Sequence, residues 1–102
     1  MKVISKLSIP LTLIFLFILI DVSFGKTVIS YQLPVFSNVD LQIYNILGQK
    51  VVTLVSEKQP EGTYKLEWNG RNSHGQQVSS GIYFYRLRAD KFHQTKKMIL
   101  LQ

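Results

Sequence analysis

The chain has 102 residues, a formal net charge of +6 and no cysteine. Its length allows one small domain. The absence of cysteine excludes disulfides, thiolate nucleophiles, cysteine-ligated zinc, iron–sulfur clusters and an N-terminal lipid anchor on cysteine. The basic residues do not form the arginine- or lysine-rich runs of a nucleic-acid binder, so no nucleic-acid partner is expected. An acidic surface or an anionic glycan would match the charge equally well.

Residues 1–25 have the pattern of a secretory signal peptide. Two lysines among the first six residues precede an apolar stretch at 7–20, which is shorter than the roughly 20 residues that a membrane-spanning helix needs. Small residues then lie at Ser23 and Gly25, the spacing that signal peptidase accepts. We predict a helical signal peptide cleaved between Gly25 and Lys26, leaving no stable transmembrane span. The alternative is an uncleaved N-terminal anchor.

After residue 25 the pattern is period-two alternation interrupted by turn residues, which is typical of β-strands. We expect a hairpin turn at Asn45–Gly48 and polar loops at 56–62 and 71–77. The strands are expected at residues 27–33, 39–46, 49–55, 64–68, 82–89 and 95–101, with a further short strand around Val78.

Six or seven antiparallel strands in residues 26–102 predict an all-β fold, a small immunoglobulin-like β-sandwich. A small barrel is the alternative. Trp68, Tyr83 and Tyr85 lie on the apolar faces of their runs and are expected to anchor the core, because each aromatic side chain buries ~150–250 Å². Phe84 lies on the opposite, charged face of its run and is expected to be partly exposed.

Four segments of the chain resemble, in order, the segments of a known module. Their distinctive residues are Tyr44, Asn45 and Gly48; then Trp68 and Gly70; then Gly75, Ser80, Gly81, Tyr83 and Tyr85; and finally the run at 95–101. Together these segments resemble the C-terminal sorting domain of the type IX (Por) secretion system, type A. That family is similar to the immunoglobulin-like domain of the flagellar hook-capping protein. The resemblance covers residues 27–102.

The resemblance implies a secretion role and not catalysis. Such a domain passes through the periplasm and is recognised by an outer-membrane translocon. A separate sorting transpeptidase then acts on the exported protein, which becomes attached to surface lipopolysaccharide or is released. The family places its export information near the C-terminus. The residues expected to contact the translocon are therefore Lys96, Lys97, Met98, Ile99, Leu100 and Leu101.

The basic side chains and the lack of a passenger each allow more than one interpretation of the function. The basic group Arg86, Arg88, Lys91, Lys96 and Lys97 would suit anionic lipopolysaccharide, but lysine on an edge strand also serves solubility and edge protection. The family usually carries a large passenger, and none lies between the predicted signal peptide and the first strand. The chain is therefore expected to be a remnant, a fragment or a small stand-alone surface protein. The alternative function is a structural or adhesive immunoglobulin-like module with no sorting role.

No catalytic, cofactor or metal site is expected. The histidines are His74 and His93, both in predicted turns or loops, and neither has a nucleophile at a suggestive spacing. The loop at 69–75 has no carboxylate, and calcium sites normally use carboxylate ligands.

Overall fold

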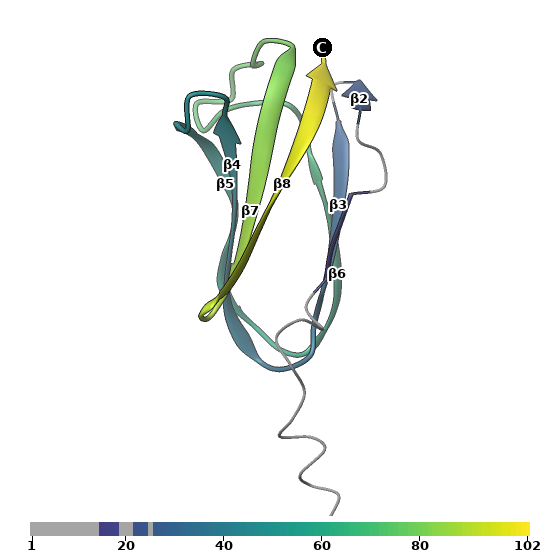
Figure 1. Ribbon diagram of the computed structural model, residues 1–102, viewed down its shortest axis with the longest axis vertical. Helices are drawn as coiled ribbons and strands as arrows, with labels where there is room; N and C mark the ends of the chain where they lie inside the picture. The colour runs from purple at the N-terminus through teal and green to yellow at the C-terminus, as the bar shows by residue number, and fades with distance from the viewer. Residues whose placement is uncertain (1–14, 19–21, 25) are drawn as a thin grey trace, which may run out of the picture.

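A computed structural model describes residues 15–18, 22–24 and 26–102 of the chain. Within these residues, six antiparallel strands form a small immunoglobulin-like sandwich of two facing sheets, which confirms the predicted all-β fold (Figure 1). The six strands are β3 (Thr27–Leu33), β4 (Ser37–Asn45), β5 (Lys50–Gln59), β6 (Gly62–Trp68), β7 (Gly81–Ala89) and β8 (Phe92–Leu101).

Two short strands from the N-terminal segment extend the sheets at their edges. Strand β1 (Phe15–Ile18) pairs antiparallel with β3, which gives one sheet the order β1-β3-β6. Strand β2 (Val22–Phe24) pairs parallel with β8, which gives the other sheet the order β2-β8-β7-β4-β5. Each N-terminal strand therefore covers part of a sheet edge.

The helix expected within the predicted signal peptide is not found at residues 15–18 and 22–24, which are strands. A short apolar run does not distinguish a helix from a strand by its periodicity. The outer edges of β3 and β8 offer unpaired backbone groups, which an extended segment can pair with. The remainder of the predicted signal peptide, including Gly25, lies outside the described residues. Among the described residues, no helix has the length and apolar character to cross a membrane.

Three predicted boundaries need correction. Strand β5 continues through residues 56–59, predicted as loop, because this edge strand pairs there with the start of β4 and its polar side chains can face solvent. Strand β8 begins at Phe92 and not at residue 95, since the β7–β8 turn has only two residues. The strand expected around Val78 is replaced by a single bridge between Arg71 and Gln77.

The alternation in the sequence correctly predicts which side chains fill the space between the sheets. Trp68 and Tyr85 are buried, and the ring of Trp68 meets that of Tyr83 edge-on at a centroid distance of 5.6 Å. The Trp68 indole N–H donates to the carbonyl of Arg71 at 3.0 Å, so Trp68 also fixes the start of the loop that follows β6. Phe84 lies on the outer face of β7 and is half-buried, as expected. The buried apolar residues are Ile29, Tyr31, Leu33, Val39, Leu41, Ile43, Trp68, Tyr83, Tyr85, Leu87, Ala89, Met98 and Leu100.

Candidate functional site

The C-terminal strand β8 presents two different faces. Lys97, Ile99 and Leu101 lie on the exposed outer face of the sheet. The alternate positions face the core, where Met98 and Leu100 are buried. Lys96 is half-buried on that same inner side. The six residues predicted to contact a translocon are therefore divided. Lys97, Ile99 and Leu101 are exposed, Lys96 is half-buried, and Met98 and Leu100 are buried in the core.

The outer edge of β8 is only partly paired. On one side β7 pairs with β8 from Phe92 to Leu100. On the other side, β2 pairs with three residues, from Ile99 to Leu101. Among the described residues, the outer edge from Phe92 to Met98 has no strand beside it, as Figure 1 shows. Unpaired strand edges are templates for pairing with another extended segment.

Gln102 fastens the end of β8 to the loop between β6 and β7. Its backbone N–H donates to the Ser80 hydroxyl at 2.9 Å, and its Nε2 donates to the carbonyls of Gly70 at 2.9 Å and Val78 at 2.7 Å. Its Oε1 accepts from Gln77 Nε2 at 2.8 Å. Gly70 and Ser80 thus act as hydrogen-bond acceptors that fix the end of the strand.

Two turns at this end of the sandwich share a sequence pattern and a hydrogen-bond geometry. The first is Asn45–Gln49, the second is Asn72–Gln76, and both read Asn-x-x-Gly-Gln. In each turn the Asn Oδ1 accepts the backbone N–H groups two and four residues later, at 2.9–3.0 Å. The Asn Nδ2 donates to the Gln side chain of the same turn.

The Gly residues of the two turns, Gly48 and Gly75, have φ values of 79° and 77°, which side chains other than glycine rarely adopt. Asn45, Gly48 and Gly75, three of the residues on which the sequence resemblance depends, are therefore turn-forming residues. The repeat was not predicted from the sequence, although a search for repeated five-residue patterns finds it.

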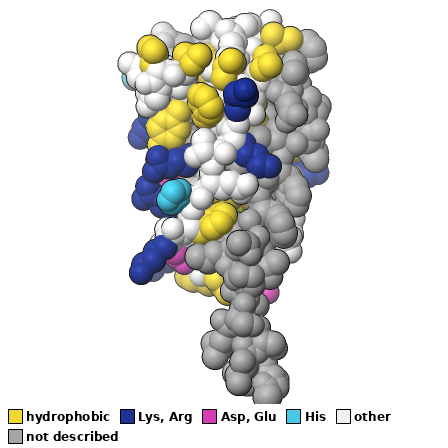
Figure 2. All heavy atoms as spheres, viewed as in Figure 1, with side chains coloured by type: hydrophobic (Ala, Val, Ile, Leu, Met, Phe, Trp, Pro, Cys, Tyr) yellow, Lys and Arg dark blue, Asp and Glu magenta, His cyan; other side chains and the backbone are white. Residues whose placement is uncertain are grey.

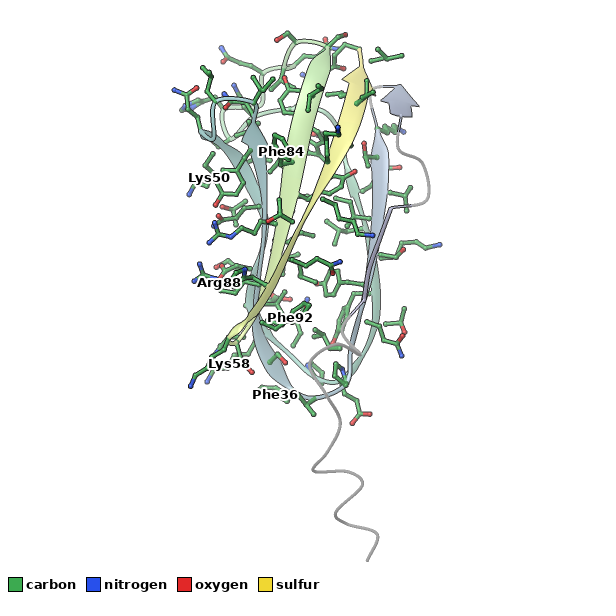
Figure 3. All side chains as sticks on the ribbon, in the orientation of Figure 1. Phe36, Lys50, Lys58, Phe84, Arg88 and Phe92 are labelled. Carbon is green, nitrogen blue, oxygen red and sulfur yellow. The ribbon has the colours of Figure 1, made fainter. Side chains whose placement is uncertain are left out.

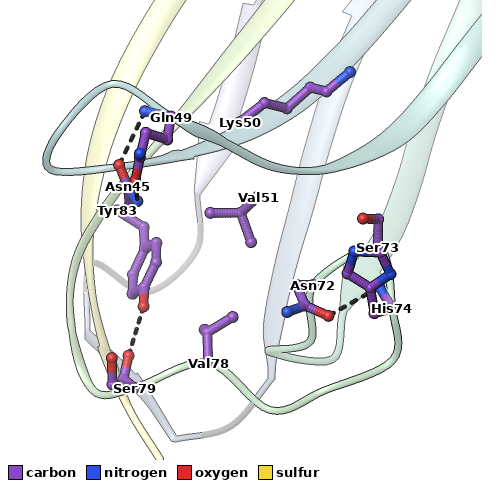
Figure 4. A pocket seen from close by; sticks show the side chains of 10 residues that line it. All are labelled: Asn45, Gln49, Lys50, Val51, Asn72, Ser73, His74, Val78, Ser79 and Tyr83. Atoms are coloured by element: carbon purple, nitrogen blue, oxygen red, sulfur yellow. Dashed lines mark hydrogen bonds between the residues drawn. The ribbon is translucent and has the colours of Figure 1, made fainter.

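A hollow of about 500 Å³ lies between these two turns (Figure 4). The polar groups around it are largely bonded to each other. The Tyr83 hydroxyl donates to the Ser79 carbonyl at 2.6 Å, and the Ser73 amide donates to the Val51 carbonyl at 3.1 Å. Figure 4 shows the Lys50 side chain extending away from Tyr83. The hollow therefore lacks the converging polar groups of a ligand site.

No arrangement for catalysis or metal binding is found in the described residues. His74 lies in the second turn, whereas His93 lies within β8 and not in the loop expected for it. Within the part of the chain that the structure describes, no three His, Asp or Glu side chains gather closely enough to hold a metal. Burial raises the pKa of Tyr31 to about 12, and its hydroxyl donates to Gln59 Oε1 at 2.6 Å. This tyrosine stays protonated and has a structural role.

The predicted basic group does not form one patch. Arg86, Arg88 and Lys97 lie on the outer face of the β7–β8 pair, and Lys96 lies on its inner side. The guanidinium Cζ of Arg86 lies 5.8 Å from the centroid of the Tyr44 ring, a cation–π distance. Tyr44 thus lies on the outer face and holds Arg86 against the sheet. Lys91 lies in the turn before β8, and Lys26 is exposed just before β3.

Comparison with known proteins identifies the family. The family model described as FlgD Ig-like domain matches residues 20–91, so the match ends before β8. FlgD from P. aeruginosa superposes with a TM-score of 0.57 and 24% identity, covering 72% of this chain and 58% of that one. No curated protein matches the sequence.

Two proteins of Porphyromonas gingivalis share the fold. Dimeric latent PorU superposes with a TM-score of 0.69 and 17% identity, covering 84% of this chain and 9% of that one. PorZ, an essential bacterial surface component of the type-IX secretion system, superposes with a TM-score of 0.58 and 15% identity, covering 85% of this chain and 11% of that one. The chain thus corresponds to little more than half of FlgD and about a tenth of the other two. At these identities the likeness shows the fold alone.

Proposed function

We propose that this chain, which belongs to the FlgD Ig-like domain family, is a sorting domain of the type IX secretion system. In this proposal the protein is exported, folds in the periplasm and is recognised by an outer-membrane translocon through β8. It then reaches the cell surface or the medium. The domain itself performs no covalent chemistry, and a separate transpeptidase carries out any cleavage or attachment to lipopolysaccharide.

The observation that carries this proposal is the open outer edge of β8. Within the part of the chain that the structure describes, this ten-residue strand pairs with β7 along one side, while three residues are paired on the other side. An exposed edge can receive an extended segment of a partner, with main-chain hydrogen bonds giving affinity and alternate side chains giving specificity. Strand β2 supports this reading, because it is itself an extended segment accepted by the same edge.

The buried and exposed faces of β8 have different roles in the proposed recognition by a partner. Met98 and Leu100 pack in the core and keep the strand in register with the rest of the sandwich. Lys97, Ile99 and Leu101 are exposed beside the open edge and are available to a partner's side chains. Likeness to PorZ, a type-IX component, supports the proposal at the level of fold.

The proposal is tested by a reporter inserted between Gly25 and Lys26, produced in a host with an active type IX system. Deleting residues 96–102 would also remove the buried Met98 and Leu100, so loss of sorting could reflect unfolding. The double variant Ile99→Lys with Leu101→Lys is sharper, since both side chains are about two-fifths exposed, at 40% and 37%. Charge beside a strand edge opposes strand addition.

The matched control is Val35→Lys with Phe36→Lys, which places two lysines at exposed apolar positions between β3 and β4. We expect the unmodified domain and the control to bring the reporter to the surface or medium, and the β8 variant to leave it in the periplasm. If the reporter stays in the periplasm with the unmodified domain, the sorting role is refuted. A structural or adhesive module, which membership of the FlgD Ig-like family also supports, is then the better account.

A further inference from the structure

Large apolar side chains gather on the outer face of the five-stranded sheet, at the end where β8 finishes. The most exposed are in the β4–β5 turn, where Ile46 is 67% and Leu47 is 78% exposed. Figure 2 shows this row of hydrophobic side chains above the basic ones. We call the following set the apolar end: Ile46, Leu47, Ile82, Phe84, Ile99 and Leu101.

The strand register makes the apolar end continuous. Ile82 is the direct cross-strand neighbour of Ile99, and Phe84 follows Ile82 on the same face of β7. Phe84 in turn neighbours Tyr44 on β4. A shallow groove of about 270 Å³ joins Phe84 and Tyr44 to Ile46 in the turn. Contiguous exposed apolar side chains on a soluble domain mark an interaction surface.

A band of cations borders the apolar end on the same face. Lys97 is the cross-strand neighbour of Phe84, and Lys50 is that of Tyr44. Arg86 and Arg88 follow Phe84 along the outer face of β7. Asp40, an acidic side chain on this face, is the neighbour of Arg88, at the end of the band away from the apolar side chains.

The spacing of the two regions suits the surface of a membrane. Residues two apart on a strand are separated by ~6.6 Å, so the Cα of Lys97 lies about one such step from the Cα of Ile99 along β8. Amphipathic elements bury their apolar side ~5–10 Å into the boundary between headgroups and acyl chains, with basic residues at the headgroups. The two most exposed side chains, Ile46 and Leu47, also project from a turn, and Leu47 lies outside the groove, which suits insertion better than docking on a rigid protein.

We propose that the apolar end inserts into the interface of a lipid bilayer that carries anionic headgroups, and that the cationic band binds those headgroups. Ile46 and Leu47 enter first, at the tip of the β4–β5 turn. Lys50, Arg86 and Lys97 then lie at the level of the headgroup phosphates. Binding to a purified bilayer requires no translocon, so a failed sorting assay leaves this interaction intact and testable.

The absence of cysteine makes the test specific, because one introduced thiol can carry an environment-sensitive dye. We place the dye at Leu47→Cys and, as the matched control, at Phe36→Cys. Phe36 is 60% exposed and lies at the opposite end of the sandwich from Phe84 (Figure 3). The labelled full-length chains are mixed with vesicles of phosphatidylcholine alone or of phosphatidylcholine with phosphatidylglycerol.

We expect a blue shift of the dye at position 47 with the anionic vesicles, and none at position 36. Adding Arg86→Gln and Lys97→Gln should weaken the apparent vesicle affinity roughly 30-fold, because each cation near an anionic surface contributes roughly fivefold. The pair Lys58→Gln and Lys65→Gln removes the same charge away from the band and should change the affinity less than threefold, by the same reasoning.

Several outcomes would overturn the proposal. Residues 1–25 are present in every variant, so sedimentation with vesicles and no dye shift at position 47 would mean that the N-terminal segment alone binds. An equal dye shift at position 47 with vesicles of phosphatidylcholine alone would show that the cationic band does not contribute to binding. A shift that rises with protein concentration without any vesicles would assign the apolar end to self-association.

Discussion

Substituting Gln102 should loosen the end of β8 and the loop that it holds. The Gln102 side chain joins three places that are distant in sequence, since it bonds with Gly70, Val78 and Gln77. Gln102→Ala removes these three side-chain hydrogen bonds and keeps the backbone bond to Ser80. Both the strand end and the loop should then become more dynamic.

The size of the effect follows from these contacts. A hydrogen bond contributes about 0.5–1.5 kcal/mol net, and exposed bonds belong at the lower end, so three of them stabilise by about 1.5–2 kcal/mol. The freed side chain regains part of its rotamer entropy, which offsets up to about 1 kcal/mol of that loss. We therefore expect a net loss of about 1 kcal/mol. In a domain of this size that lowers Tm by roughly 4–8 °C.

Thermal unfolding followed by circular dichroism measures this loss, and hydrogen exchange locates it. Exchange should accelerate at residues 70–80 and at the last residues of β8, with little change in the buried strand β4. Gln32→Ala is the matched control, because Gln32 is an exposed glutamine near the end of β3, where it pairs with Thr63 and lies away from the end of β8. If the two variants unfold at the same temperature and exchange alike, Gln102 does not hold the strand end, and the reasoning is refuted.

Other predictions concern Tyr31, the paired turns and β2. Burial raises the pKa of Tyr31 from 10.0 to about 12, so its contribution to stability is complete below pH 10 and is lost as pH rises through 12. Tyr31→Phe should cost about 1 kcal/mol at neutral pH and should reduce the alkaline loss of stability between pH 10 and 12, as measured by urea unfolding across that range. If the Tyr31→Phe variant lost as much stability between pH 10 and 12 as the unmodified chain, this prediction would be contradicted. Asn45→Ala removes the Oδ1 that accepts two backbone N–H groups of its turn and should cost about 1 kcal/mol in urea unfolding, whereas no loss would show that the turn forms without these hydrogen bonds. The register of β2 predicts that Val22→Cys with Ile99→Cys forms a disulfide on mild oxidation, seen on a non-reducing gel. The out-of-register pair Val22→Cys with Leu101→Cys should form much less, and equal yields would argue against the pairing.

Alternation along the chain is enough to predict much of the sandwich. Residues two apart on a strand share a face, so the inward positions of β4, β6 and β7 follow from the sequence. The same rule, applied to β8, separates Lys97 and Ile99 from Lys96 and Met98 by sequence position alone. The turn at Asn45–Gly48 is likewise local, because its hydrogen bonds and its positive φ lie within five residues.

Only the tertiary structure decided which segments lie beside one another. Alternation gives the two faces of a strand, but the neighbour at each edge depends on the path of the whole chain. The sequence therefore did not indicate that β2 would pair with β8, or that Gln102 would reach Gly70. Nor did it show that polar residues 56–59 would continue β5, since an edge strand needs backbone partners on one side and no apolar face along its whole length. The apolar end likewise exists only because the fold brings one turn and the ends of two strands to the same place.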